Sequence, residues 1–234
     1  MSYFALIPAA GSGSRIGAAS PKQYLPLLGK PMLHHSIGCV ARAPIETVFV
    51  VLAPGDAAFA QHDWSAFGGK VEPLYCGGGT RRDSVLNGLV AAMDVVDADD
   101  WVLVHDAARP CLPHADLERL IDEVSVDEVG GLLALAVAET VKRVALGVDA
   151  AVADEVRVEC TEDRSRLWLA QTPQMFRAGL LAQALRDARG VVTDEASAVE
   201  MLGLHPRIVR GSRRNLKVTF PEDMAIAESM LGQE

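Results

Sequence analysis

Cysteine is scarce in this chain, and the cysteines present are far apart. The 234 residues contain four of them, Cys39, Cys76, Cys111 and Cys160, and no two form a CxxC pair. This spacing excludes the usual cysteine-based zinc and thioredoxin-like motifs, and the length excludes a small disulfide-stapled scaffold. We therefore expect free core thiols in a reducing compartment, the cytoplasm.

Long apolar runs and an excess of positive charge are also missing. No stretch approaches the roughly 18 uninterrupted apolar residues of a membrane span, and residues 1–8 lack the basic region of a signal peptide. The 22 Lys and Arg against 31 Asp and Glu give a formal net charge of −9, a poor match to a polyanion such as DNA. We expect neither a membrane nor a nucleic acid as partner, so any anion-binding site must be local.

The composition and the order of apolar segments indicate an α/β domain. Half of the residues are apolar and 23% are charged, and the length suits one domain over residues 1–234. Apolar runs of strand length at 3–8, 47–53 and 101–105 alternate with helical patterns at about 31–43, 80–96 and 113–124. This alternation predicts a Rossmann-like, mostly parallel sheet with helices on both faces.

The second half of the chain interrupts this pattern. Residues 130–138 predict another central strand, but 140–145 and 155–160 then alternate apolar and polar residues around a turn-rich loop. We expect a β-arm at about 139–161 that projects from the sheet, and because an isolated ribbon is marginally stable in water, it needs a partner surface and suits dimerisation. Further strands are expected at 167–171 and 216–218, with helices near 177–188, 194–202 and after Pro221.

The first strand runs into a glycine-rich stretch that suits phosphate binding. Gly11-x-Gly13 follows a strand, but the third glycine stands at position 17 where the dinucleotide motif GxGxxG needs position 16. The stretch instead contains Arg15 and is followed by Lys22. Backbone N–H groups and two cations suit a triphosphate, although either cation alone would more often be a solvated surface side chain.

Asp106 follows the strand expected at 101–105. Open α/β sheets bind ligands at the carboxyl ends of their strands, and one carboxylate there suits Mg²⁺, which takes its other ligands from phosphate and water. Without its neighbours, Asp106 would as readily be a helix or turn cap. We interpret the adjacent His105 as a packed side chain, because no second ligand stands at metal-binding spacing.

Seven short motifs occur in an order that resembles one enzyme family. They are PAAGSGSR at 8–15, PKQY at 21–24, RDSV at 82–85, HDAARP at 105–110, LAQTPQ at 169–174, TDEA at 193–196 and NLKVT at 215–219. Together they resemble the 2-C-methyl-D-erythritol 4-phosphate cytidylyltransferases of non-mevalonate isoprenoid biosynthesis, over essentially the whole chain. The glycine loop alone would indicate only the wider sugar-phosphate nucleotidyltransferase superfamily.

The resemblance implies a role for individual residues. The residues implied to hold the cytidine part of CTP, largely through backbone groups, are Ala9, Ala10, Gly11, Gly79 and Ser84. The cations implied at the triphosphate are Arg15, Lys22 and Lys217, with Mg²⁺ bound by Asp106. The residues implied to hold methylerythritol phosphate are Arg109, Thr140, Arg164, Thr172 and Thr193, with Arg164 supplied by the partner subunit of a homodimer.

The implied reaction is attack of the acceptor phosphate on the α-phosphorus of CTP, with release of pyrophosphate. A phosphate monoester dianion is already a competent nucleophile, so positioning and charge stabilisation suffice without a general base. Two alternatives stay open: a ribitol 5-phosphate cytidylyltransferase, which shares the loop, and a non-catalytic nucleotide-binding regulator of the same fold. The presence of both Lys22 and Asp106 disfavours the regulator.

Overall fold

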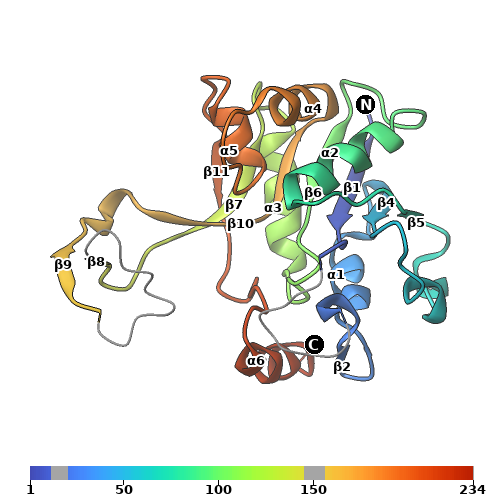
Figure 1. The fold of residues 1–234 in the computed structure, drawn as a ribbon, viewed down its shortest axis with the longest axis horizontal. Coiled ribbons are helices and arrows are strands. Elements are labelled where there is room, and N and C mark those ends of the chain that lie inside the picture. Colours follow the sequence, from blue (N-terminus) through green and yellow to red (C-terminus); the bar gives the residue numbers. More distant parts are fainter. Residues whose placement is uncertain (12–20, 145–155, 234) are drawn as a thin grey trace.

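The computed structural model describes residues 1–11, 21–144 and 156–233, and within these ranges a seven-stranded sheet carries helices on both faces (Figure 1). The strand order is β11-β7-β10-β6-β1-β4-β5. The strands are β1 (Tyr3–Pro8), β4 (Ile45–Val51), β5 (Val71–Leu74), β6 (Trp101–Val104), β7 (Gly131–Ala136), β10 (Trp168–Arg177) and β11 (Arg207–Arg210). Only β10 runs antiparallel to its neighbours in this sheet, so the predicted mostly parallel α/β fold is confirmed.

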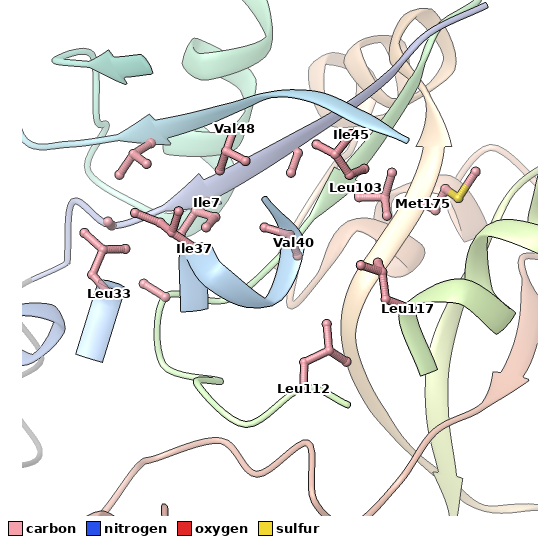
Figure 2. Packing of buried hydrophobic residues seen from close by; sticks show 14 of the residues in the cluster. Ile7, Leu33, Ile37, Val40, Ile45, Val48, Leu103, Leu112, Leu117 and Met175 are labelled. Carbon is pink, nitrogen blue, oxygen red and sulfur yellow. The ribbon is translucent and has the colours of Figure 1, made fainter. Parts of the chain in front are cut away.

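Alternating side chains along the strands explain why both faces are covered. In β1, Ala5 and Ile7 belong to one buried cluster, whereas Phe4 and Leu6 belong to the other. The first cluster includes side chains of α1 (Met32–Val40) and α3 (His114–Val124), and Figure 2 shows it. The second includes side chains of α2 (Arg81–Ala91), α4 (Ala178–Asp187) and α5 (Glu195–Glu200).

A smaller cluster joins the C-terminal helix to the chain after residue 21. Helix α6 (Pro221–Leu231) packs beside the short hairpin of β2 (Pro26–Leu27) and β3 (Lys30–Pro31). The buried residues of this cluster include Leu27, Met32 and Val218. This contact brings the segment around residue 217 close to the loop that follows β6. None of the described helices is long and apolar enough to cross a membrane.

The predicted β-arm projects from the sheet (Figure 1). Its strands β8 (Lys142–Val144) and β9 (Val158–Thr161) pair antiparallel, and every residue of β9 is exposed. The arm is therefore confirmed in its described parts. The expected loop between its strands falls largely on residues 145–155, which lie outside the described ranges.

Four strands differ from the sequence-based expectation. The strand expected at 216–218 is wrong: the Val218 N–H donates to the Ala108 carbonyl at 2.8 Å, so this segment binds a loop and not a strand. The strand expected at 167–171 is longer, since β10 continues to Arg177. Pro173 is tolerated within it because it lies where the β10–β7 register shifts, between Ala170 and Gln174. The edge strands β5 and β11 were not predicted, since they are short and carry proline or charged residues.

Candidate active site

A cavity of about 560 Å³ lies at the carboxyl ends of the central parallel strands. Four segments line it: the loop after β1, the loop that leads into α2, the loop after β6, and the segment before α6 that contains Lys217. The predicted site residues that it brings together are Ala9, Ala10, Gly11, Lys22, Gly79, Ser84, Asp106 and Lys217. Arg15, the other predicted phosphate contact, lies outside the described residues.

Alanine and glycine residues, Ala9, Ala10, Gly11, Gly78 and Gly79, form one wall of this cavity, so much of that wall is main chain. The Ala9 N–H donates to the Val51 carbonyl and the Gly77 N–H to the Leu52 carbonyl, both at 2.8 Å. A Cβ atom on Gly77 would lie 2.8 Å from the Leu52 oxygen and would clash with the Cβ of Ala10. The two loops therefore approach so closely that position 77 requires glycine.

The start of α2 fixes the other side of the glycine loop. Thr80 and Asp83 form a capping box, in which each side chain accepts the backbone N–H of the other residue. The buried Ser84 hydroxyl donates to the Thr80 carbonyl at 3.0 Å and accepts the Gly78 N–H at 3.1 Å. Ser84 thus holds the loop with a hydroxyl that already has two partners.

Gln23 supports the loop after β1, and sequence reasoning missed it. Its buried side chain donates from Nε2 to the Ala9 carbonyl at 2.6 Å. The ammonium of the neighbouring Lys22 donates to the Val218 carbonyl. Gln23 stands next to Lys22 in the motif PKQY, and this position is the sequence signal that could have identified it.

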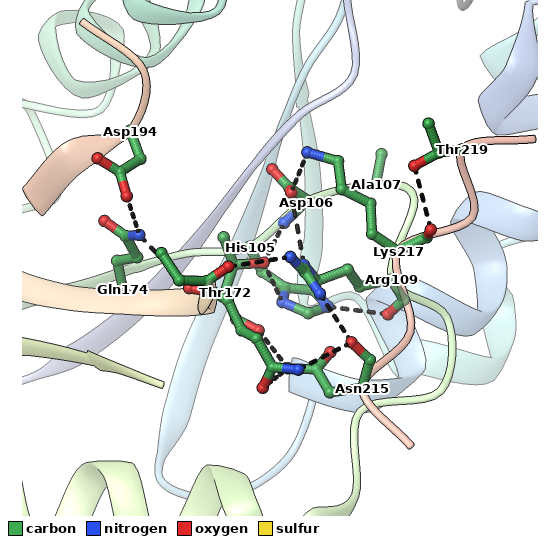
Figure 3. A network of polar contacts seen from close by, with 12 residues as sticks. His105, Asp106, Ala107, Arg109, Thr172, Gln174, Asp194, Asn215, Lys217 and Thr219 are labelled. Atoms are coloured by element: carbon green, nitrogen blue, oxygen red, sulfur yellow. Dashed lines mark hydrogen bonds and ion pairs between the residues drawn. The ribbon is translucent and has the colours of Figure 1, made fainter. Parts of the chain in front are cut away.

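Asp106 lies at the wall of the cavity among three cations. Its carboxylate is 2.8 Å from Lys217 Nζ, 3.1 Å from Arg81 Nη2 and 3.6 Å from Arg109 Nε (Figure 3 shows the lysine and Arg109). Burial by itself raises the pKa of Asp106, but the charges of these cations hold that pKa well below its usual range. Asp106 is therefore an ionised carboxylate aimed at cations and not merely a cap.

A chain of hydrogen bonds behind Asp106 fixes its loop (Figure 3). The Asp106 N–H donates to Thr172 Oγ1 at 2.9 Å, and that hydroxyl lies 3.2 Å from His105 Nδ1. His105 Nε2 lies 3.1 Å from the Arg109 carbonyl, so the network assigns the tautomer with the proton on Nε2. Burial lowers the pKa of His105 to about 4. The prediction of a packed histidine is confirmed.

A second cavity of about 230 Å³ adjoins the first. The two share a wall of Arg81, Asp106 and Lys217. The predicted acceptor residues that line the second cavity are Arg109, Thr172 and Thr193. Thr140 and Arg164 line neither cavity; both are exposed, Thr140 at the start of the β-arm and Arg164 in the short 3-10 helix that follows β9.

The second cavity is held by buried polar side chains. Arg109 donates from Nη1 to the Asn215 carbonyl at 2.7 Å, and burial lowers its pKa. Gln174, which sequence reasoning missed, donates to Asp194 and accepts the Ala196 N–H, each at 2.8 Å. The Arg109 contact joins the segment that contains residue 215 to the loop after β6, and the Gln174 contacts join the start of α5 to β10.

Arg81 was also missed, because its partner is remote in sequence. Its guanidinium forms a bidentate ion pair with Glu195, with Nη–Oε distances of 2.5 and 3.0 Å across a separation of 114 residues. The Glu195 side chain is 1% exposed. The sequence places Arg81 only near the start of the helical pattern at about 80–96, and nothing in that pattern points to residue 195.

The donor set at Asp106 fits Mg²⁺. Among the described residues, no group of three or more His, Cys, Asp or Glu side chains is placed to hold a metal ion. One ionised carboxylate at a cavity wall is what Mg²⁺ uses when phosphate oxygens and water supply the remaining ligands. The cations Lys22 and Lys217 line the same cavity and suit such phosphates.

Comparison with known proteins identifies the family. The family model of 2-C-methyl-D-erythritol 4-phosphate cytidylyltransferase matches residues 3–233. The chain belongs to this family. Relatives of that name from Nitrosospira multiformis and Aromatoleum aromaticum are each 55% identical to it, over 98% of the chain and 97% and 95% of the relatives.

Solved structures agree with this family assignment. A crystal structure of 4-diphosphocytidyl-2C-methyl-D-erythritol synthase matches with a TM-score of 0.82 and 40% identity, over 98% of both chains. The 2-C-methyl-D-erythritol 4-phosphate cytidylyltransferase of Francisella tularensis matches with a TM-score of 0.78 and 34% identity, over 98% of this chain and 100% of that one. The family and fold predicted from the sequence are therefore confirmed.

Proposed function

We propose that this chain transfers the cytidylyl group of CTP to 2-C-methyl-D-erythritol 4-phosphate. The products are 4-diphosphocytidyl-2-C-methyl-D-erythritol and pyrophosphate, in non-mevalonate isoprenoid biosynthesis. Family membership supports this activity. The observation that carries the mechanism is the pair of adjoining cavities that share Asp106 and Lys217, because two phosphates must meet for the transfer.

The larger cavity is the proposed CTP site. Its main-chain wall, from Ala10, Gly11 and Gly79, offers N–H and C=O groups to the hydrogen-bonding edge of cytosine and to the ribose. Ala9 lines the same wall, and its N–H and C=O hold the loop through Val51 and Gln23. Ser84 acts here by holding the glycine loop. Because the loops are tied to β4 and α2, the recognition groups are in place before the ligand enters.

Cations at the same cavity are proposed to stabilise the transferring phosphates. Lys22 and Lys217 line it, and the family resemblance adds Arg15. Charge develops on the pyrophosphate oxygens as the bond to the α-phosphorus breaks, and preorganised cations stabilise that charge most in the transition state. Asp106 is the proposed Mg²⁺ ligand; when bound, the ion would neutralise part of the triphosphate charge.

The smaller cavity is the proposed acceptor site. Arg109 and Thr193 offer a cation and a hydroxyl to a sugar-alcohol phosphate, while Thr172 lines the cavity and holds the Asp106 loop. We propose that Thr140 and Arg164 complete the site in a homodimer, with Arg164 reaching the cavity of the partner subunit. Both residues are exposed, Thr140 on the β-arm and Arg164 just after it, which supports this arrangement. The expectation of core thiols holds for Cys111 and is wrong for the exposed Cys160, but all four cysteines are free, which supports a cytoplasmic location.

One assay tests the proposed function against its alternatives. The protein is incubated with Mg²⁺ and each of the four nucleoside triphosphates, with either methylerythritol 4-phosphate or ribitol 5-phosphate, and pyrophosphate release is measured. We expect the highest kcat/KM with CTP and methylerythritol 4-phosphate. Faster turnover with ribitol 5-phosphate would assign the other acceptor, and no release with any pair would leave a nucleotide-binding regulator.

A further inference from the structure

Arg81 lies where the two cavities meet. It is the first residue of α2 and lines both cavities. Its guanidinium contacts Asp106 Oδ1 at 3.1 Å while it holds both carboxylate oxygens of Glu195. Glu195 is the first residue of α5. Through Arg81, the starts of two helices and the loop after β6 are joined at one point.

Glu195 acts as an anchor for Arg81. Its side chain is almost fully buried, and a bidentate pair fixes the plane of the guanidinium. A buried ion pair adds little stability relative to apolar side chains of similar size. Stability alone therefore does not account for a pair placed at a cavity wall with 29% of the Arg81 side chain exposed.

Lys217 contacts the same carboxylate but is held differently. Its ammonium lies 2.8 Å from Asp106 Oδ2, and its side chain is 43% exposed. Lys217 belongs to an irregular segment of the chain. A phosphate that enters the cavity can therefore draw Lys217 away from Asp106. Arg81 stays with Glu195 and holds Asp106 Oδ1, while the buried Arg109 lies 3.6 Å from Oδ2, so Asp106 keeps fixed partners during that exchange.

We propose that Arg81 is a positioning residue for the transfer reaction, anchored by Glu195 so that Asp106 and the starts of α2 and α5 keep their relative positions. The proposal rests on the proposed function, since it takes the phosphates of the two substrates to meet at Asp106. In this proposal Arg81 acts through Asp106, whereas Lys22 and Lys217 act by direct contact with the phosphates.

The deciding variant is Glu195→Gln, which leaves Arg81 in place but removes the charge that anchors it. We expect kcat to fall about 10- to 100-fold, because small misplacements of reacting groups cost up to about 10²-fold. The Kd of CTP, measured by calorimetry in metal-free buffer, should stay within about threefold of the wild-type value. Arg81→Lys keeps the charge without the bidentate geometry, and it should show the same fall in kcat with the same small change in the Kd of CTP.

A double variant and a neighbouring arginine complete the experiment. Arg81→Gln with Glu195→Gln leaves no unpaired buried charge, so it provides a folded protein if Glu195→Gln unfolds; it should lose kcat and keep its CTP affinity. Arg82→Gln is the control, since Arg82 donates to the Leu185 carbonyl at 2.8 and 2.5 Å and lines neither cavity. It should keep both values, and thermal unfolding verifies that each variant is folded.

Three results would overturn the proposal. A wild-type kcat in Glu195→Gln together with a large loss in Arg81→Lys would mean that Arg81 contacts the phosphates directly. A CTP Kd that rises by the factor by which kcat falls would make Arg81 a nucleotide ligand. A wild-type kcat in the double variant would leave the ion pair a purely structural role. An inactive wild-type protein would instead contradict the proposed function.

Discussion

The ammonium of Lys217 lies 2.8 Å from the carboxylate of Asp106, at the wall that the two cavities share. The aspartate follows a central strand and is nearly buried, whereas the lysine belongs to an irregular segment and is 43% exposed. One member of the pair is therefore fixed and the other has room to move. This asymmetry suits a site in which a carboxylate keeps its place while cations follow the phosphates.

Lys22→Ala should lower kcat much more than it weakens CTP binding. We expect a loss of roughly 10²–10³-fold in kcat, the range observed for other preorganised electrostatic groups. Steady-state kinetics with pyrophosphate detection measures kcat and the KM for CTP. The control is Lys30→Ala, because Lys30 is exposed and lines neither substrate cavity. A near-normal kcat with only a raised KM for CTP would show that Lys22 merely binds the ground state.

Asp106→Asn should raise the Mg²⁺ concentration needed for half-maximal activity. The substitution keeps the side-chain shape but removes the formal charge that would hold the ion. A Mg²⁺ titration at saturating substrates measures the shift, and Asp94→Asn, at an exposed aspartate, is the control. An unchanged titration would reduce Asp106 to a structural partner of Lys217 and Arg81.

Stability in metal-free buffer should fall as the pH drops from about 6.5 to about 4, in part because of His105. Burial lowers the pKa of His105 from 6.5 to about 4, so between these values the unfolded state binds a proton that the folded state does not. The contribution of His105 is complete above pH 6.5 and is lost towards pH 4, by roughly 3 kcal/mol.

Urea unfolding at several pH values tests this assignment. His105→Asn should give a flatter dependence of the unfolding free energy than the wild type over that range, because the titrating ring is gone. His205→Asn, at an exposed histidine, should follow the wild-type curve. Parallel curves for His105→Asn and the wild type would show that His105 does not carry the effect.

Mixing two inactive variants should restore activity if the site is shared across a two-fold dimer. Lys22→Ala and Arg164→Ala should each be nearly inactive alone. After subunit exchange in an equal mixture, half of the dimers are hybrids, and each hybrid has one pocket with an intact Lys22 and an intact Arg164. Activity should therefore recover to about a quarter of the wild-type value.

Native mass spectrometry should confirm that the subunits have exchanged. Two Lys22→Ala preparations mixed in the same way provide the control and should stay inactive. A mixture of the two variants that exchanges fully but remains as inactive as its parents would rule out a pocket completed by the partner's arm.

Gly77→Ala should damage the CTP site. The added methyl would clash with Ala10 and lie 2.8 Å from the Leu52 carbonyl oxygen, and overpacking of this kind costs about 1–3 kcal/mol. We expect a lower Tm and weaker CTP binding in calorimetry. Gly55→Ala is the matched control, because a Cβ at Gly55 meets nothing within 4 Å. Equal behaviour of the two variants would contradict the close approach of the loops.

The parts of the site that follow strands could be predicted from the sequence. The apolar run before Asp106 placed it at the end of β6, and parallel strands bring that end next to the loop at Gly11. The capping box at Thr80 was equally local, since its two partners stand three residues apart. Such features depend on short stretches of chain, and residue spacing records them directly.

The supporting contacts could not be predicted in this way. The Arg81–Glu195 pair depends on how α2 and α5 pack, and one sequence contains no record of that packing. Residues 216–218 alternate like a strand because Val218 is buried and Lys217 is exposed. Alternation reports burial, and it does not say whether the backbone pairs with a strand or with the loop at Ala108.

The main-chain wall of the larger cavity has a consequence for inhibitors. A compound that binds to the N–H and C=O groups of this wall would depend little on the identity of any side chain, so most single substitutions would remove few of its contacts. The position that could reshape the wall, Gly77, is confined by Ala10 and Leu52, and a larger residue there would also disturb the natural ligand. A point mutation that weakens the binding of such a compound should therefore also weaken the binding of CTP.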